Sequence, residues 1–96
     1  MVTTATRWVP VLRRRGADVV VVLAHGGVRG TSSYGGDLPA ENPADIVAAT
    51  VPGIDVVVVG HTHQDVPERW VTNEVTGKQV LLTQPKFWAQ TVSEVD

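Results

Sequence analysis

Two short runs of valine dominate the hydrophobic pattern of the chain. Asp18 is followed by six apolar residues that end at Ala24, and a second apolar run, 54–59, is interrupted only by Asp55. Neither run alternates regularly with polar residues, and β-branched runs of this length are typical of strands that are covered on both faces. The pattern therefore predicts two strands, 18–24 and 54–59, each buried on both faces.

A helix is predicted before each of these strands. Within residues 6–15, Trp8, Val11 and Leu12 follow the i, i+3, i+4 spacing that places apolar side chains on one helix face. A second helix is predicted to start at Asn42, a good N-cap residue followed by a proline, and to end before the next Val-Pro-Gly segment.

The remaining segments predict a loop and shorter strands. Residues 26–39 are rich in Gly, Ser and Thr, which favours a loop. Strands 70–72 and 79–83 would pair around a turn at 73–78, and 87–95 is predicted to be a last strand. Because helices alternate with apolar strands, we expect the α/β fold class, with no linker dividing the chain.

Composition narrows the function classes. The 96 residues carry 8 Lys and Arg against 10 Asp and Glu, a formal charge of −2, which gives no reason to expect a nucleic-acid polymer or a membrane surface as partner. Cysteine is absent, so disulfide scaffolds, thiolate metal sites and thiol catalysis are excluded. The apolar runs are too short to span a bilayer, and no signal peptide is expected within this sequence.

The three histidines follow the two predicted strands. His25 comes directly after the first strand, and His61 and His63 come after the second, with glycines beside them. Ligands bind at the carboxyl ends of strands in open α/β sheets, so neighbouring strands would bring the three imidazoles to one crevice. Imidazole suits Zn, Mn, Fe, Co or Ni. Histidines two residues apart can both bind one metal ion, or each can bind one of two neighbouring ions. A lone histidine after a strand is more often a surface residue, and a dinuclear site would also need carboxylates.

Two segments carry a resemblance to a known family. Residues 16–27 (GADVVVVLAHGG) and 51–63 (VPGIDVVVVGHTH) resemble the calcineurin-like metallophosphoesterases, and within them the bacterial 5′-nucleotidase / 2′,3′-cyclic-nucleotide phosphodiesterase branch. In that family one strand ends in a His followed by small residues, and a later strand ends in Gly-His-x-His. The resemblance extends from Thr6 to Val95.

The resemblance implies a ligand assignment. Carried over residue by residue, His25 and His61 share one metal ion, and His63 binds the other at a position where some nucleotidases have Gln. The complete domain would hold two divalent ions, of Mn, Zn, Co or Fe, which bind the phosphoryl oxygens and activate the attacking hydroxide. The implied substrates are nucleoside 5′-monophosphates, 2′,3′-cyclic nucleotides or other small phosphoesters.

Three further motifs of the family are missing from the chain. Its Asp-x-His, Gly-Asp-x-x-Asp and Gly-Asn-His-Asp/Glu motifs lie N-terminal to the matching region, and none occurs here. The resemblance therefore implies that residues 1–96 are the C-terminal portion of a catalytic domain, half of a four-layer α/β/β/α sandwich. Its partner would be the missing N-terminal half. The chain would contain no catalytic residue, would be inactive in isolation, and would work in a periplasmic, extracellular or cell-wall location.

Other functions compete with this interpretation. Amidohydrolases place a His-x-His after their first barrel strand, which leaves His25 unexplained, and β-lactamase-fold hydrolases would need a His where Val66 stands. The non-enzyme alternative is a truncated α/β module without catalysis.

Overall fold

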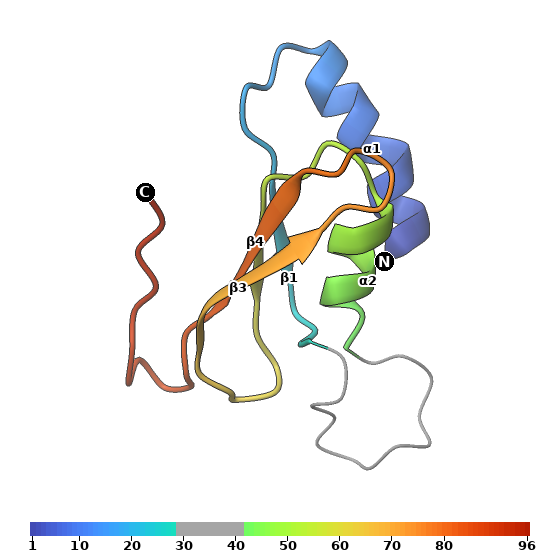
Figure 1. Ribbon diagram of the computed structural model, residues 1–96. Helices are drawn as coiled ribbons and strands as arrows, with labels where there is room; N and C mark the ends of the chain where they lie inside the picture. Colours follow the sequence, from blue (N-terminus) through green and yellow to red (C-terminus); the bar gives the residue numbers. More distant parts are fainter. Residues whose placement is uncertain (29–41) are drawn as a thin grey trace.

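The fold is one mixed sheet with two helices (Figure 1). The computed structural model describes residues 1–28 and 42–96. The elements are α1 (Val2–Arg14), β1 (Val21–Ala24), α2 (Ala44–Thr50), β2 (Val56–Val59), β3 (Val66–Thr72) and β4 (Gln79–Gln84). Figure 1 shows both helices on the same side of the sheet, so the described chain has two layers. The predicted α/β class is confirmed, and one helix layer on one sheet corresponds to half of the four-layer sandwich.

The strand order determines which strands end at the same edge of the sheet. The sheet runs β1-β2-β4-β3, with β1, β2 and β4 mutually parallel and β3 antiparallel to β4. β1 and β2 are direct neighbours, paired from Val21 with Val56 to Ala24 with Val59. The carboxyl ends of the three parallel strands therefore meet at one edge of the sheet. The predicted pairing of the last two strands is also confirmed, although β3 begins four residues earlier than predicted.

The core lies between the helices and one face of the sheet, and the other face is open. Val20 and Val57 are 2% and 0% exposed, whereas Val21 and Leu23 on β1 are 50% and 80% exposed. The prediction that both faces of the first valine strand are buried is wrong for the described residues. Successive side chains of a strand point to opposite faces, and only one face has a helix layer over it.

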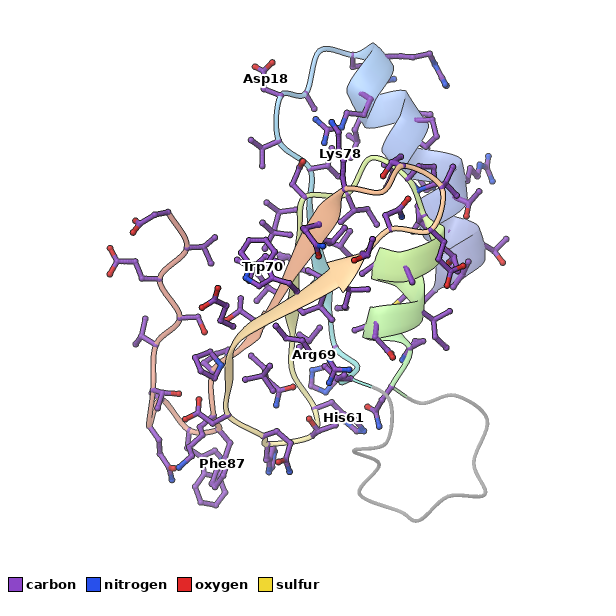
Figure 2. All side chains as sticks on the ribbon, viewed as in Figure 1. Asp18, His61, Arg69, Trp70, Lys78 and Phe87 are labelled. Carbon is purple, nitrogen blue, oxygen red and sulfur yellow. The ribbon has the colours of Figure 1, made fainter. Side chains whose placement is uncertain are left out.

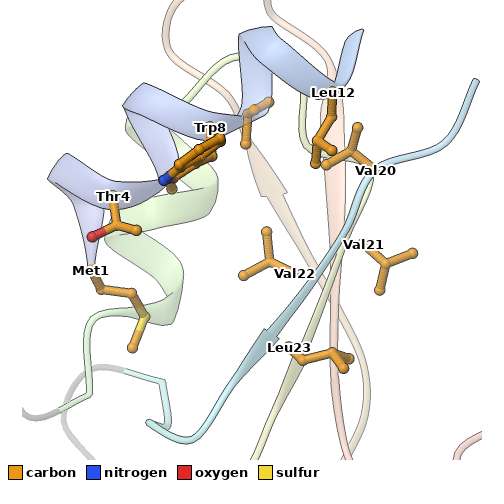
Figure 3. Close-up of a pocket in the computed structure, with 10 residues that line it drawn as sticks. Met1, Thr4, Trp8, Leu12, Val20, Val21, Val22 and Leu23 are labelled. Carbon is orange, nitrogen blue, oxygen red and sulfur yellow. The ribbon is translucent and has the colours of Figure 1, made fainter. Parts of the chain in front are cut away.

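The predicted apolar face of the first helix is also only partly used. Val9 is 3% exposed and packs in the core, whereas Trp8 and Leu12 are 50% and 44% exposed. Trp8 and Leu12 instead border a groove between α1 and β1, whose other wall includes Leu23 (Figure 3). Because β1 is an edge strand, nothing among the described residues continues the sheet beyond this groove.

The last segment differs from its prediction. Residues 85–96 contain no strand, although 87–95 was expected to form one. Pro85 has no N–H to donate to a ladder, and Trp88 and Ala89 have φ angles of 54° and 56°, which are incompatible with an extended chain. Most of the predicted loop 26–39 lies outside the described residues. Neither described helix has the length and apolar composition that a bilayer crossing requires.

Arg13 ties the end of α1 to the starts of the first two strands. Its Nε donates to the carbonyl oxygen of Gly53 at 3.0 Å, and its Nη2 forms an ion pair with Asp55 Oδ2. The same Oδ2 accepts a hydrogen bond of 2.7 Å from the backbone N–H of Val20, which is buried. The two acidic residues that precede the strands therefore differ, because Asp18 offers Arg13 only its backbone carbonyl.

Replacing Asp55 by Ala should lower the free energy of unfolding by about 2 kcal/mol, because the buried N–H of Val20 loses its acceptor. The ion pair itself contributes little, since its side chains are 32% and 42% exposed. Urea unfolding of the two variants Asp55→Ala and Asp18→Ala measures the difference. Equal stability of the two variants would contradict this role of Asp55.

Candidate metal centre

The structure places the rings of two of the three histidines next to each other. His25 directly follows β1, and His61 follows β2 after one glycine, so the parallel register places both at the carboxyl edge. Their ring centroids lie 5.3 Å apart in an edge-to-face arrangement with 66° between the ring planes. Two imidazoles bound to one metal ion through bonds of about 2.1 Å have centroids roughly 5 Å apart. The spacing of this pair therefore fits two ligands of a single ion.

His63 does not join the pair. Its ring stacks on Phe87 with a centroid distance of 4.7 Å, and Phe87 in turn contacts the edge of Trp88 at 5.1 Å. Figure 2 shows Phe87 at the same end of the molecule as His61 and opposite Asp18. Within residues 1–28 and 42–96, no three His, Asp or Glu side chains gather closely enough to hold a metal ion. Among the described residues, this edge of the sheet therefore holds two neighbouring imidazoles and no third candidate ligand beside them.

Gly27 allows the segment after β1 that carries His25 (the His25 loop) to pack directly on the segment after β2 that carries His61 (the His61 loop). A Cβ at Gly27 would lie 2.3 Å from Thr62 Cγ2 and 3.0 Å from Asn42 Oδ1. The N–H of Gly27 donates to that Asn42 oxygen at 2.7 Å. Asn42 therefore does not cap α2 as its sequence context predicts. Pro43 is the N-cap residue, and the Asn42 side chain serves the His25 loop instead.

The turn that carries His61 is strained. His61 has a φ of 72°, and the N–H of Thr62 donates to the carbonyl oxygen of Gly60 at 2.8 Å. This i to i+2 bond around a positive φ defines the rarer, strained kind of γ-turn. His63 is also left-handed, with a φ of 58°. Such conformations cost about 1–3 kcal/mol per residue and persist only where their surroundings enforce them, often at functional sites.

A buried polar pair beneath this turn was missed in the sequence. Thr62 and Gln84 are 6% and 1% exposed, and the Thr62 hydroxyl donates to Gln84 Oε1 at 3.0 Å. Gln84 Nε2 donates to the carbonyl oxygen of Gln64 at 2.9 Å. The available signal was a polar residue directly after the predicted strand 79–83, at the carboxyl end of β4, which runs parallel to β2.

The chain is similar to several known proteins. A family model described as Calcineurin-like phosphoesterase matches residues 3–65. A Haemophilus influenzae protein named 2′,3′-cyclic-nucleotide 2′-phosphodiesterase/3′-nucleotidase is 35% identical over 103 aligned positions, covering 100% of this chain and 15% of that protein. A Salmonella typhimurium protein of the same name is 39% identical over 64 positions, covering 67% of this chain and 9% of that protein.

A solved structure shows the same fold. The crystal structure of a candidate 5′-nucleotidase from Staphylococcus aureus superposes with a TM-score of 0.64 and 28% sequence identity. The match covers 88% of this chain and 16% of that one. The chain therefore spans about a sixth of the length of its structural neighbour and less than that of the two named relatives.

Proposed function

We propose, since this chain belongs to the calcineurin-like phosphoesterase family, that it supplies the histidine side of a metal-dependent site that hydrolyses nucleotide phosphoesters. The observation that carries the proposal is the facing pair of His25 and His61 at the carboxyl ends of adjacent parallel strands. The nucleotide substrate class is proposed from the names of the two bacterial relatives.

The donor set fits a divalent ion. Imidazole nitrogens suit Zn, Mn, Co or Fe, and the exposed His25 ring leaves the pair open to solvent on one side. A divalent ion held there would polarise the phosphoryl group toward attack. We propose that His25 and His61 hold one ion and that His63, which is turned toward Phe87, serves a second one. The identity of the ions is part of what the experiments below measure.

We further propose that the chain works as part of a larger catalytic domain. It covers 15% of the Haemophilus influenzae relative, and its described residues offer no third ligand to the His25–His61 pair. The open face of β1 and the groove along Trp8 and Leu12 expose apolar side chains that a further layer would cover (Figure 3). The remaining metal ligands and the group that protonates the leaving alcohol would come from that layer.

The alternatives named from the sequence are weaker. An amidohydrolase would place its histidines inside a closed barrel, whereas this sheet has two edges, β1 and β3. The family match also accounts for the strand before His25, which the amidohydrolase alternative leaves unexplained. A non-catalytic module is the second candidate, and the following experiment separates it from the enzyme.

A chimeric enzyme tests the proposed function. Residues 1–96 replace the aligned 15% of the Haemophilus influenzae relative, and hydrolysis of a 2′,3′-cyclic nucleotide is measured with Mn²⁺, Co²⁺ or Zn²⁺. We expect metal-dependent turnover well above that of a chimera in which His25 and His61 are both alanine. A correctly folded chimera with no turnover would favour the non-catalytic module.

The 96-residue chain alone should show no phosphoesterase activity. Its described residues provide two facing imidazoles but no carboxylate to complete the site. With the same metal ions, its rate on p-nitrophenyl phosphate and on nucleotides should equal that of the metal ions alone. Turnover above that background, lost in the His25→Ala variant, would show that the chain is sufficient by itself.

A further inference from the structure

The turn after β2 needs something to hold it. The γ-turn at His61 and the left-handed backbone of His63 are both conformations that residues other than glycine rarely adopt. A short loop with two such residues would relax to another shape unless side chains outside the loop fixed it. The described contacts of this loop show which residues do so.

Gln84 is the residue in position to fix the turn. It is 1% exposed, and both atoms of its amide are engaged by the loop. A backbone carbonyl can only accept a hydrogen bond, so Nε2 must face the oxygen of Gln64. Oε1 then faces Thr62, whose hydroxyl must donate. One glutamine therefore binds the loop on both sides of His63, with a single allowed orientation.

The two hydrogen bonds that join Gln84 to Thr62 and Gln64 form a clamp on this loop. Thr62 connects the clamp to the segment that carries His25 and Gly27. Its side chain lies between Gln84 and Gly27, where any side chain at position 27 would collide with it. Its backbone N–H closes the γ-turn around His61. A movement of Thr62 would therefore shift His61 relative to His25.

We propose that Gln84 and Thr62 are positioning residues that hold the strained turn, so that His61 faces His25 before any metal ion binds. The proposal rests on the proposed metal function, and it adds residues beyond the histidines. Gln84 lies outside residues 3–65, which the family model matches. Residues that hold a metal ligand in its binding orientation typically raise metal affinity by about 10–100-fold.

The test uses four forms of the 96-residue chain. Thr62→Val removes the hydroxyl at almost constant shape, and Thr62→Ser keeps it. Thr83→Val is the matched control, because Thr83 is the buried neighbour of Gln84 on β4 and its hydroxyl bonds to Pro67 and Ser93, away from the histidines. Wild type, the fourth form, is compared with all three.

The first measurement is made without metal. In wild type and Thr62→Ser, NMR should show contacts between the His25 and His61 rings and the strong amide-to-Hα contact within His61 that marks a positive φ. Both signals should be lost in Thr62→Val and retained in Thr83→Val. Retention of both signals in a folded Thr62→Val chain would overturn the clamp, as would their equal loss in Thr83→Val.

The second measurement adds Zn²⁺ and follows the imidazole nitrogen shifts of each histidine. Thr62→Val should weaken Zn²⁺ binding at His25 and His61 by about tenfold or more, whereas Thr62→Ser and Thr83→Val should stay close to wild type. If Thr62→Val unfolds the chain, Gln84→Glu replaces it. A glutamate accepts from Thr62 but offers no donor to Gln64, and unchanged affinity in that variant would overturn the clamp.

The two measurements separate the two proposals. Wild type that shows the metal-free ring contacts but no Zn²⁺ response at His25 and His61 would contradict metal binding by this pair and leave the clamp standing. Wild type that binds Zn²⁺ with the same affinity as a folded Thr62→Val chain would refute the clamp and leave the metal function standing.

Discussion

Replacing His25 by alanine in the chimeric enzyme should abolish most of its activity, and removing His61 as well should cost almost nothing further. The two rings face each other at 5.3 Å, and we propose that they share one ion. Loss of a mere outer partner of a metal ligand costs about 10–100-fold, so loss of a ligand should lower turnover by at least about 100-fold. Once that ion is lost, the second histidine has nothing left to hold.

Metal content and rate, measured together, decide this prediction. His25→Ala and His61→Ala should each lose one equivalent of metal, and the double variant should lie within about threefold of either single variant, which is the usual error of additivity. If the two effects simply multiplied, the two histidines would serve different ions. Retention of both equivalents in the single variants would contradict the pair as a ligand set.

His63 supplies the internal control for the same experiment. Its ring lies on Phe87 and outside the pair, and glutamine occurs at the corresponding position of some nucleotidases according to the resemblance. His63→Gln should therefore keep measurable activity with a shifted metal preference, because an amide oxygen is a weaker ligand than imidazole for Zn²⁺ but acceptable to Mn²⁺. A His63→Gln enzyme as inactive as His25→Ala would make the assignment of ligands to ions wrong.

Adding one methyl group at Gly27 should strongly destabilise the chain. Its Cβ would lie 2.3 Å from Thr62 Cγ2 and 2.9 Å from Thr62 Oγ1, and Thr62 is held by Gln84. Overpacking of this kind costs about 1–3 kcal/mol. We expect Gly27→Ala to lower the free energy of unfolding by about 3 kcal/mol, because Gln84 holds Thr62 in place. The two histidine loops should separate as a result.

Gly60, which directly follows β2, offers a matched control. Among the described residues, a Cβ there would come within 4 Å only of His25 Nδ1, at 3.7 Å, which is an ordinary contact. Urea unfolding should therefore show a much smaller loss for Gly60→Ala than for Gly27→Ala. The double variant Gly27→Ala/Thr62→Ser, which removes the methyl group at 2.3 Å, should regain part of the stability. Equal losses at the two glycines would show that the loops do not pack as described.

Local patterns in the sequence were sufficient for most of the elements and for part of the site. The apolar runs predicted strands at 18–24 and 54–59, of which 21–24 and 56–59 form strands, and the order of helices and strands predicted an α/β sheet. Because parallel strands end at the same edge, the positions of His25, His61 and His63 after those runs predicted that all three would converge. The structure brings His25 and His61 together, whereas His63 lies on Phe87. These features depend on neighbours in the chain and on strand direction, which a sequence displays directly.

The rest depended on contacts between residues far apart in the chain. The strand 18–24 was predicted to be buried on both faces, yet Leu23 is 80% exposed. Burial depends on which layers cover a sheet, and the sequence of the strand does not show this. The turn geometry that directs His63 to Phe87, and the buried Gln84 that engages Thr62 across 22 positions, have no local periodicity. Hydrogen-bond partners of buried polar groups are settled only when the strands are brought together, so only the tertiary structure could identify them.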